Sequence, residues 1–419
     1  MISPRTLSRR DFVLVVLAGT LLITLLQQLH HYSAQDYRPP GSGPDVAQQL
    51  KWLGQALRQG AGESTQAWYP EGYFFTHAIY GSALINQARL HPEDSTLRQR
   101  NIKEVEWVLE RLESAQGQAP FPQPQAVEYG VFYQGWSNRL LGGWLSLQLE
   151  ADRDPARVEQ FHRQAAALAQ AFQQSPTHHL EAYPGGSWPV DNVVALTSLR
   201  LHDDLYGTHY VEVVDLWLNY TRAHLDPATG LLPHRLDAQT GQLHGGARAS
   251  SLVMALCFLG ELDAEFAHEQ YARFRKLYAQ PVLDFVLMRE YPLGLSGPGD
   301  VDSGPLLGDI SPISSGVALA TARIHDDEET FERLIQLSEV VGLPTTLGDK
   351  KWFSLGLLPV GDAFLVWGKT MVPWRKTAEP AAPRGYPRLT STWYACTNGL
   401  AFFMALGLGL IVWRKTRSA

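Results

Sequence analysis

Apolar residues recur along most of the chain three or four positions apart, which is the spacing of a helical face. In the stretch VEVVDLWLNYTRAHL, for example, Val211, Val214, Leu218 and Leu225 fall on one side of a helix. This pattern predicts about a dozen helices and hardly any strand. The expected helices cover residues 45–58, 71–90, 94–115, 130–150, 155–174, 191–204, 208–224, 248–260, 263–279, 311–325, 328–341 and 354–369.

The connections between these helices alternate between short polar ones, such as HPED and HDDEE, and long ones rich in Gly, Pro and aromatic residues. If neighbouring helices pair antiparallel, all of the long loops lie at one end of the molecule. Six helix pairs with one decorated end predict an all-α fold, an (α/α)6 barrel whose long loops lead into its inner helices. A helical-repeat solenoid is the alternative, but the helix pairs share no repeated consensus.

Both ends of the chain carry apolar runs without a charged residue, at positions 12–29 and 393–413. A membrane-spanning helix needs about 17–25 residues, so each run predicts a transmembrane helix. A twin-arginine export signal is the alternative for the first run, because it follows Arg9 and Arg10, and buried core helices are the alternative for both. The flanking basic residues predict cytoplasmic termini and a main domain on the outer, periplasmic side of a bacterial-type inner membrane.

These features divide the chain into seven segments. We expect a cytoplasmic N-terminus (1–11), a first span or uncleaved signal anchor (12–29), a linker (30–46), the barrel (47–372), a Pro-rich linker (373–392), a second span (393–413) and a basic cytoplasmic tail (414–419). The expected partners are the lipid bilayer and a small molecule bound in the barrel.

Charge and cysteine content exclude several classes of function. The net charge is −7 and no long basic run occurs in the interior, which argues against nucleic acid as a partner. The only cysteines are Cys257 and Cys396, so no disulfide framework is present. Counted from Asp300, an EF-hand would need an oxygen ligand at the fifth position and Glu at the twelfth, where the chain has Gly304 and Ser311. We predict no metal and no cofactor.

The long loops concentrate carboxylates and aromatic residues. Such a site suits an uncharged organic substrate, for example a sugar or an isoprenoid-like molecule. Carboxyl groups in poorly hydrated surroundings have raised pKa values, and two in unequal environments can divide the acid and base roles. The candidate catalytic residues are Asp191, Glu128, Asp300 and Asp302, and the candidate substrate-binding residues in the loops are Tyr133, Trp136, Tyr183, Trp188, His234 and Arg248.

Each candidate also has a structural alternative. Asp191 precedes the helical run NVVALTSL and could be its N-cap, and Asp309 is expected to cap the helix near residue 311. Asp300 and Asp302 could organise their loop through Asx turns. Glu128 could be favoured by the dipole of the helix that it opens. Trp136 and Trp188 could be core residues.

The stretch 183–278 resembles the linalool dehydratase/isomerase domain family. The shared features are a Pro before an aromatic turn, Asn192 at the start of a helix, and the motifs GTHY, WL and LDPATG. Weaker similarity covers YQGWSN, which contains Tyr133 and Asn138, and the loop with Asp300. In this comparison Asp191 and a position near Ala182 stand where the family has cysteines.

The resemblance implies an (α/α)6 barrel with an active site built partly at a subunit interface, and therefore a homo-oligomer. It also implies acid–base chemistry on a monoterpene alcohol, without metal or organic cofactor, and it adds Asn138 and Asn192 to the substrate-binding candidates. Trp136 takes the place of a family histidine. The leading hypothesis is therefore a membrane-anchored hydro-lyase or isomerase. The alternatives are a carbohydrate-active hydrolase or lyase on the same barrel, and a non-catalytic envelope binding or scaffold protein.

Overall fold

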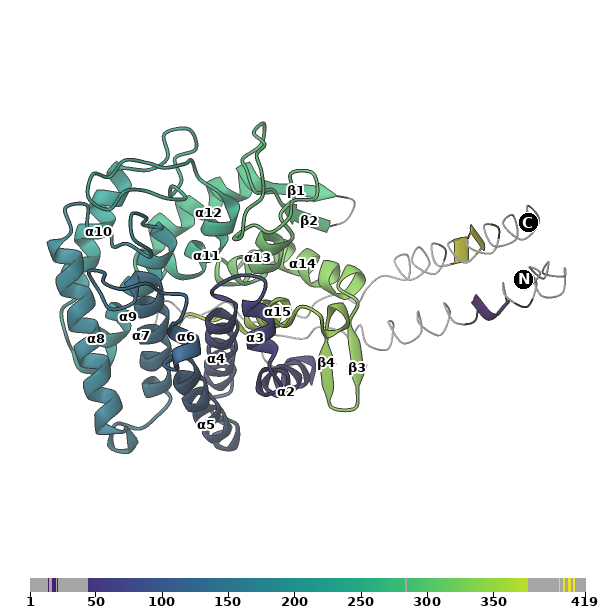
Figure 1. Ribbon diagram of the computed structural model, residues 1–419, viewed down its shortest axis with the longest axis horizontal. Coiled ribbons are helices and arrows are strands. Elements are labelled where there is room, and N and C mark those ends of the chain that lie inside the picture. The colour runs from purple at the N-terminus through teal and green to yellow at the C-terminus, as the bar shows by residue number, and fades with distance from the viewer. Residues whose placement is uncertain are drawn as a thin grey trace, which may run out of the picture.

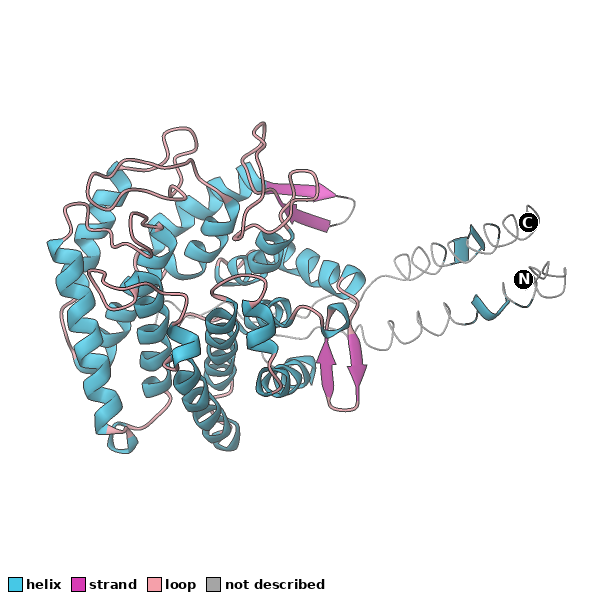
Figure 2. Cartoon of the chain, in the orientation of Figure 1, coloured by secondary structure: helices cyan, strands magenta, loops and turns pink. Residues whose placement is uncertain are grey.

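The computed structural model describes residues 44–282 and 285–375, together with a few isolated positions near both ends of the chain. Helices make up most of this region, and the strands form only two small hairpins (Figure 2). The predicted all-α class is therefore confirmed. The arrangement described below is consistent with the expected barrel.

Six helices form a closed inner ring (Figure 1). Each packs against the next, and the last returns to the first. A ring helix meets protein on nearly every side, so its sequence is apolar almost all round. The helix at residues 72–90, for example, is buried along most of its length. In ring order these helices are α4 (Gly72–Leu90), α7 (Gly130–Ser146), α9 (Pro189–Tyr206), α11 (Ala249–Leu259), α13 (Pro312–Ile324) and α15 (Pro359–Thr370).

A second set of helices covers the outside of the ring, and each packs on one or two ring helices. These helices are amphipathic, because only one face of each meets the ring. Several begin with an acidic N-cap: Asp94, Asp154, Asp263 and Asp327 each accept a backbone N–H of the first turn. The outer helices are α2 (Pro44–Arg58), α5 (Ser95–Leu112), α8 (Pro155–Gln174), α10 (Val211–Ala223), α12 (Ala264–Tyr278) and α14 (Glu328–Val341).

All twelve predicted helices are present, most with ends within a few residues of the predicted ones. The last begins at Pro359 rather than at residue 354, because Leu355 has a positive φ that interrupts the run. The helical pattern missed α3 (Ala61–Gln66), α6 (Ala115–Gln118) and the 3-10 turn Glu150–Asp152 as separate elements, because they are too short to show periodicity. It merged a second 3-10 turn, Ser354–Gly356, into the last predicted helix.

Two antiparallel hairpins lie within the long loops. β1 (Ala279–Val282) pairs with β2 (Phe285–Met288), with Ala279 opposite Met288. β3 (Thr345–Leu347) pairs with β4 (Lys350–Trp352), with Thr345 opposite Trp352, and β4 packs on α2. As predicted, each long loop leads from an outer helix into a ring helix. The ring helices therefore begin where the long loops gather, which we call the loop end of the ring.

The opposite end of the ring is closed by the last described residues. Trp374 is buried, and its indole N–H donates to Asn86 Oδ1 at 2.6 Å. Beside it, Arg139 on α7 forms a buried two-pronged ion pair with Glu261, at 2.9 and 2.7 Å. The backbone N–H of Trp374 also donates to Glu261. The chain is thus packed against the ring as far as Arg375.

The membrane prediction is corrected. Across the described ranges, no helix is long and apolar enough to cross a bilayer. The two predicted spans, 12–29 and 393–413, lie mostly outside the described residues. The result for the described helices overturns the assignment of the chain as an inner-membrane protein. The predicted division into linkers and tails stays a prediction.

Candidate active site

Three carboxylates from three separate loops meet at the loop end of the ring. Asp191 lies in the first turn of α9, Glu71 immediately precedes α4, and Asp302 lies in the loop between β2 and α13. Asp302 and Glu71 are both close enough to Asp191 to raise the pKa of its carboxyl group. Folding thus brings together positions more than 100 residues apart in the sequence.

Asp191 is the most enclosed of the three, with only 9% of its surface exposed. Burial raises the pKa of its carboxyl group well above the usual range, and the negative charges of Asp302 and Glu71 raise it further. The alternative that Asp191 caps α9 is wrong, because the helix begins at Pro189 and its N-cap, Trp188, makes no side-chain cap. The surroundings of Asp191 therefore favour its protonated form.

The two aspartates of the loop before α13 differ in their surroundings. Asp300 Oδ1 accepts the backbone N–H groups of Asp302 at 3.1 Å and Ser303 at 3.0 Å, which confirms the predicted Asx turn. Partial burial would raise the pKa of Asp300, but its hydrogen bond and ion pair with Arg248 lower it overall. Asp300 is therefore an ionised group that fixes the loop.

Asp302 is exposed at its edge to solvent, but protein atoms enclose it closely on its other sides. This desolvation, together with the charges of Asp300 and Glu71, raises the pKa of Asp302 to about 6. Within the described residues its carboxylate makes no hydrogen bond. Asp302 is thus an accessible carboxylate that changes protonation near neutral pH.

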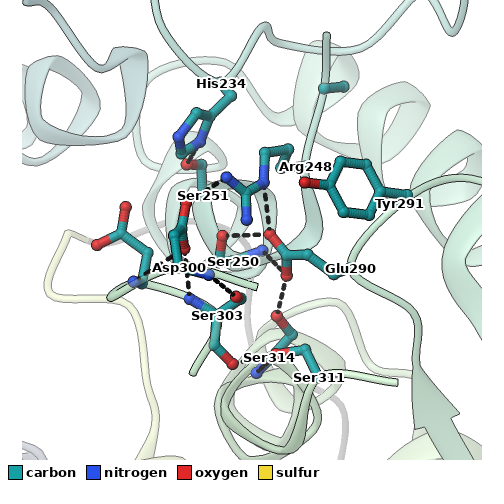
Figure 3. Close-up of polar contacts among 12 residues, drawn as sticks. His234, Arg248, Ser250, Ser251, Glu290, Tyr291, Asp300, Ser303, Ser311 and Ser314 are labelled. Carbon is teal, nitrogen blue, oxygen red and sulfur yellow. Dashed lines mark hydrogen bonds and ion pairs between the residues drawn. The ribbon is translucent and has the colours of Figure 1, made fainter. Parts of the chain in front are cut away.

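Arg248 and Glu290 tie this loop to the ring (Figure 3). Arg248 lies between Glu290 and Asp300. Its Nε donates to Glu290 Oε1 at 2.8 Å, and its Nη1 pairs with Asp300. Glu290 is fully buried and also accepts the hydroxyl groups of Ser250 at 2.7 Å and Ser314 at 3.0 Å. Since these serines belong to α11 and α13, the network holds the loop against the starts of two ring helices.

Glu290 was not among the sequence candidates. The signal available in the sequence was a glutamate within the largely apolar run VLMREYP, because a charged residue that such a run buries needs partners. The predicted cap Asp309 is also corrected. Ser311 caps α13 by accepting the N–H of Ser314, whereas Asp309 pairs with Arg289 at 3.0 Å.

Aromatic side chains surround the three carboxylates. The hydroxyl group of Tyr183 donates to Glu71, and its ring lies edge-on to Trp188 with the centroids 6.0 Å apart. Burial raises the pKa of Tyr69, and the charges of Glu71 and Asp302 raise it further, so this phenol also lies near both acids. Glu71 and Tyr69 stand in the long loop AWYPEGYFF but were not selected as site residues from the sequence.

His234 completes this end of the site. Its Nδ1 lies 2.6 Å from Ser251 Oγ, and its ring lies edge-on to Trp188 at 6.5 Å. Burial lowers the pKa of His234 to about 4, and the neighbouring Arg248 contributes in the same direction. The imidazole is therefore neutral at physiological pH.

The remaining predicted residues lie elsewhere. Glu128 is exposed and makes no contact with the three carboxylates in the described structure. Tyr133 and Trp136 are buried among other aromatic rings of the core. Asn138 donates to Ser198 at 2.9 Å inside the ring. Substrate contacts for these residues stay a prediction.

Asn192 holds the loop before α9. Its Oδ1 accepts the N–H of Leu180 at 2.7 Å, and its Nδ2 donates to the carbonyl of Trp188 at 2.9 Å. These bonds fix the segment that carries Tyr183 and Trp188 against the start of α9. Asn192 therefore positions the site within the described structure.

Comparison with known proteins gives a different relationship from the one that the sequence suggested. None of the protein-family models searched matches the chain. One similar solved structure is an inactive variant of the family 76 α-1,6-mannanase of Salegentibacter sp. HEL1_6 in complex with α-1,6-mannotriose. It is 11% identical to this chain with a TM-score of 0.44, and the match covers 76% of this chain and 99% of that chain. A family 76 glycoside hydrolase from a bovine Bacteroides thetaiotaomicron strain is 10% identical with a TM-score of 0.42, over 77% of both chains.

These findings overturn the resemblance to the linalool dehydratase/isomerase family. Both of these solved structures are glycoside hydrolases, and no family model supports a link to the dehydratase/isomerase family. The expectation of a hydro-lyase or isomerase is corrected with it. The two compared enzymes are carbohydrate-active hydrolases, which is the class named in the alternative hypothesis.

Proposed function

We propose that this chain is a glycoside hydrolase built on an (α/α)6 toroid, with Asp191 as the general acid and Asp302 as the carboxylate that acts on water or on the sugar. Glycoside hydrolysis generally needs one carboxylic acid to protonate the leaving oxygen and one carboxylate on the other side of the bond. The observation that carries the proposal is the unequal environment of these two acids.

The protonation states fit this division of roles. Asp191 is buried and has a strongly raised pKa, whereas Asp302 is accessible and has a pKa of about 6. The surroundings of Asp191 favour its acid form, whereas Asp302 is mostly ionised at pH 7 to 8, and such chemistry requires this pairing. Asp300 and Arg248 position Asp302 through the Asx turn and the ion pair.

The surrounding groups favour a neutral sugar. Tyr183 and Trp188 offer aromatic faces on which the apolar face of a sugar ring can pack, while the phenol of Tyr69 and the carboxylate of Glu71 can bond to hydroxyl groups. Arg248 is already neutralised by Glu290 and Asp300, so it does not specify an anionic substrate. The substrate class is therefore an uncharged oligosaccharide.

The test is hydrolysis of a panel of neutral oligosaccharides, beginning with the α-1,6-linked mannose oligomers bound by the compared mannanase. We expect the wild-type chain to release reducing sugar and D191N to lose about 10²–10⁴-fold in kcat, the usual contribution of a general acid. The exposed variant E128Q is the matched control and should retain activity. Binding of the oligomers without cleavage would contradict the proposal and favour a non-catalytic binding protein.

A further inference from the structure

A histidine and two aspartates at the loop end of the ring have the arrangement of a metal site. One ring nitrogen of His234 and one carboxylate oxygen each of Asp300 and Asp302 all lie within 4.8 Å of one another. Ligands that bind Zn²⁺ at about 2.0–2.2 Å are themselves at most ~4.4 Å apart, so small side-chain movements would bring all three atoms onto one ion.

The second observation concerns His234 itself. This residue is 9% exposed, and its ring faces Asp300 (Figure 3). Nδ1 is engaged by Ser251 Oγ at 2.6 Å, while Nε2 has no hydrogen-bond partner in the described part of the chain. Metal-binding imidazoles commonly use one nitrogen for the ion and the other for an orienting hydrogen bond. Ser251 thus fixes the ring with Nε2 available as a ligand.

The charges around this point also favour a cation. Arg248 is the one positive group among the residues labelled in Figure 3, where it pairs with Glu290 and Asp300, and its charge also acts on Asp302. Three carboxylates against one guanidinium leave two negative charges uncompensated when all are ionised. The charge of Glu71 also acts on Asp302 and adds to this excess. A divalent cation would balance this excess.

We propose that His234, Asp300 and Asp302 bind one divalent cation of the zinc type. A nitrogen ligand favours Zn²⁺ over Mg²⁺ and Ca²⁺, which prefer oxygen ligands alone. Three protein ligands leave a coordination position for water, whose pKa a bound Zn²⁺ lowers towards 7.

The test is calorimetric titration of the EDTA-treated full chain with ZnCl₂. We expect one Zn²⁺ per chain, at least about 100-fold weaker binding in H234Q and in D302N, and about 10-fold weaker binding in S251A, which removes only the orienting bond. H244Q and D309N, from the same loops, are the matched controls and should bind zinc as the wild type does. CaCl₂ should bind more weakly than ZnCl₂.

Circular dichroism of each metal-free variant shows whether it is folded. Absence of zinc binding by the wild type, or equal binding by folded H234Q and D302N, would overturn the proposal. The measurement needs no substrate, so its failure is distinct from failure of the proposed hydrolase.

Discussion

Two groups of carboxylates in this barrel differ in the cations that accompany them. At the loop end of the ring, burial and the charges of Asp302 and Glu71 raise the pKa of Asp191, and burial and the charges of Asp300 and Glu71 raise that of Asp302. Between α2, α14 and α15, Asp45 and Glu339 are buried with two lysines. We call this second group the lysine cluster.

The lysine cluster is fully enclosed. Lys369 Nζ lies 2.8 Å from Asp45 Oδ2 and 3.4 Å from Glu339 Oε1, and Lys351 Nζ lies 2.8 Å from the same Glu339 oxygen. Burial alone would raise the pKa of Asp45, but Lys369 and Lys351 lower it below its usual value. The cluster therefore favours the charged forms of Asp45 and Lys369.

The same residue type thus serves structure or chemistry according to its partners. Carboxylates that are matched by cations have fixed charges, and they join α2 to the last ring helix. Asp191 and Asp302 are not matched by cations in this way and have raised pKa values, which favours roles in proton transfer. Measurements of stability and of rate can test this difference between the two groups.

Removal of a cation from the lysine cluster should have the largest effect on stability. We expect K369M to lower the free energy of unfolding by about 3–5 kcal/mol, because it leaves Asp45 buried without its main partner. K51M removes the ion pair between Lys51 and Asp349, both of which are exposed. It should change the free energy of unfolding by less than about 1 kcal/mol. Urea unfolding at pH 7 measures both, and equal effects would refute the distinction.

The site should show the protonation of Asp302 in its pH profile. Without added metal, we expect kcat/KM to fall about 10-fold per unit as the pH drops below about 6, because Asp302 must be ionised to act. The high-pH limb should report the loss of the Asp191 proton, above the usual range of an aspartate. A rate measured from pH 4 to 9 that is flat through pH 6 would contradict the role of Asp302.

Stability should respond to pH in opposite directions in the two groups. The folded-state pKa of Asp191 is raised, so its contribution is favourable below the unfolded-state pKa and is lost as the pH rises towards the folded one. We therefore expect D191N to be more stable than the wild type by about 0.5–2 kcal/mol at pH 7, with a smaller difference near pH 4.

The contribution of Asp45 to stability should depend on pH in the opposite direction to that of Asp191, in the same unfolding experiment. Its folded-state pKa is lowered, so its contribution is present above the unfolded-state pKa and is lost as the pH falls through the folded one. We expect D45N to be less stable than the wild type at pH 7 and to approach it only in strong acid. A D191N chain less stable than the wild type at pH 7 would show that Asp191 is structural.

The sequence by itself determined the helices, their order and the end of the ring that carries chemistry. Apolar periodicity predicted each of the twelve helices because a helix that faces a core must repeat its apolar residues with its own turn. The alternation of long and short connections placed Asp191, Asp302, Tyr183, Trp188 and His234 at one end. The family resemblance misled, because short motifs shared by helical barrels do not define a reaction.

Only the tertiary structure decided which of these residues meet. Local sequence makes Asp300 and Asp302 equivalent, yet one is bound by Arg248 from another loop and the other faces Asp191 and Glu71. Glu128 and Glu71 both precede ring helices, yet Glu71 contacts Tyr183 whereas Glu128 is exposed. A carboxyl group's pKa depends on desolvation and on charges within several ångströms, and the neighbours that supply them come from distant parts of the chain.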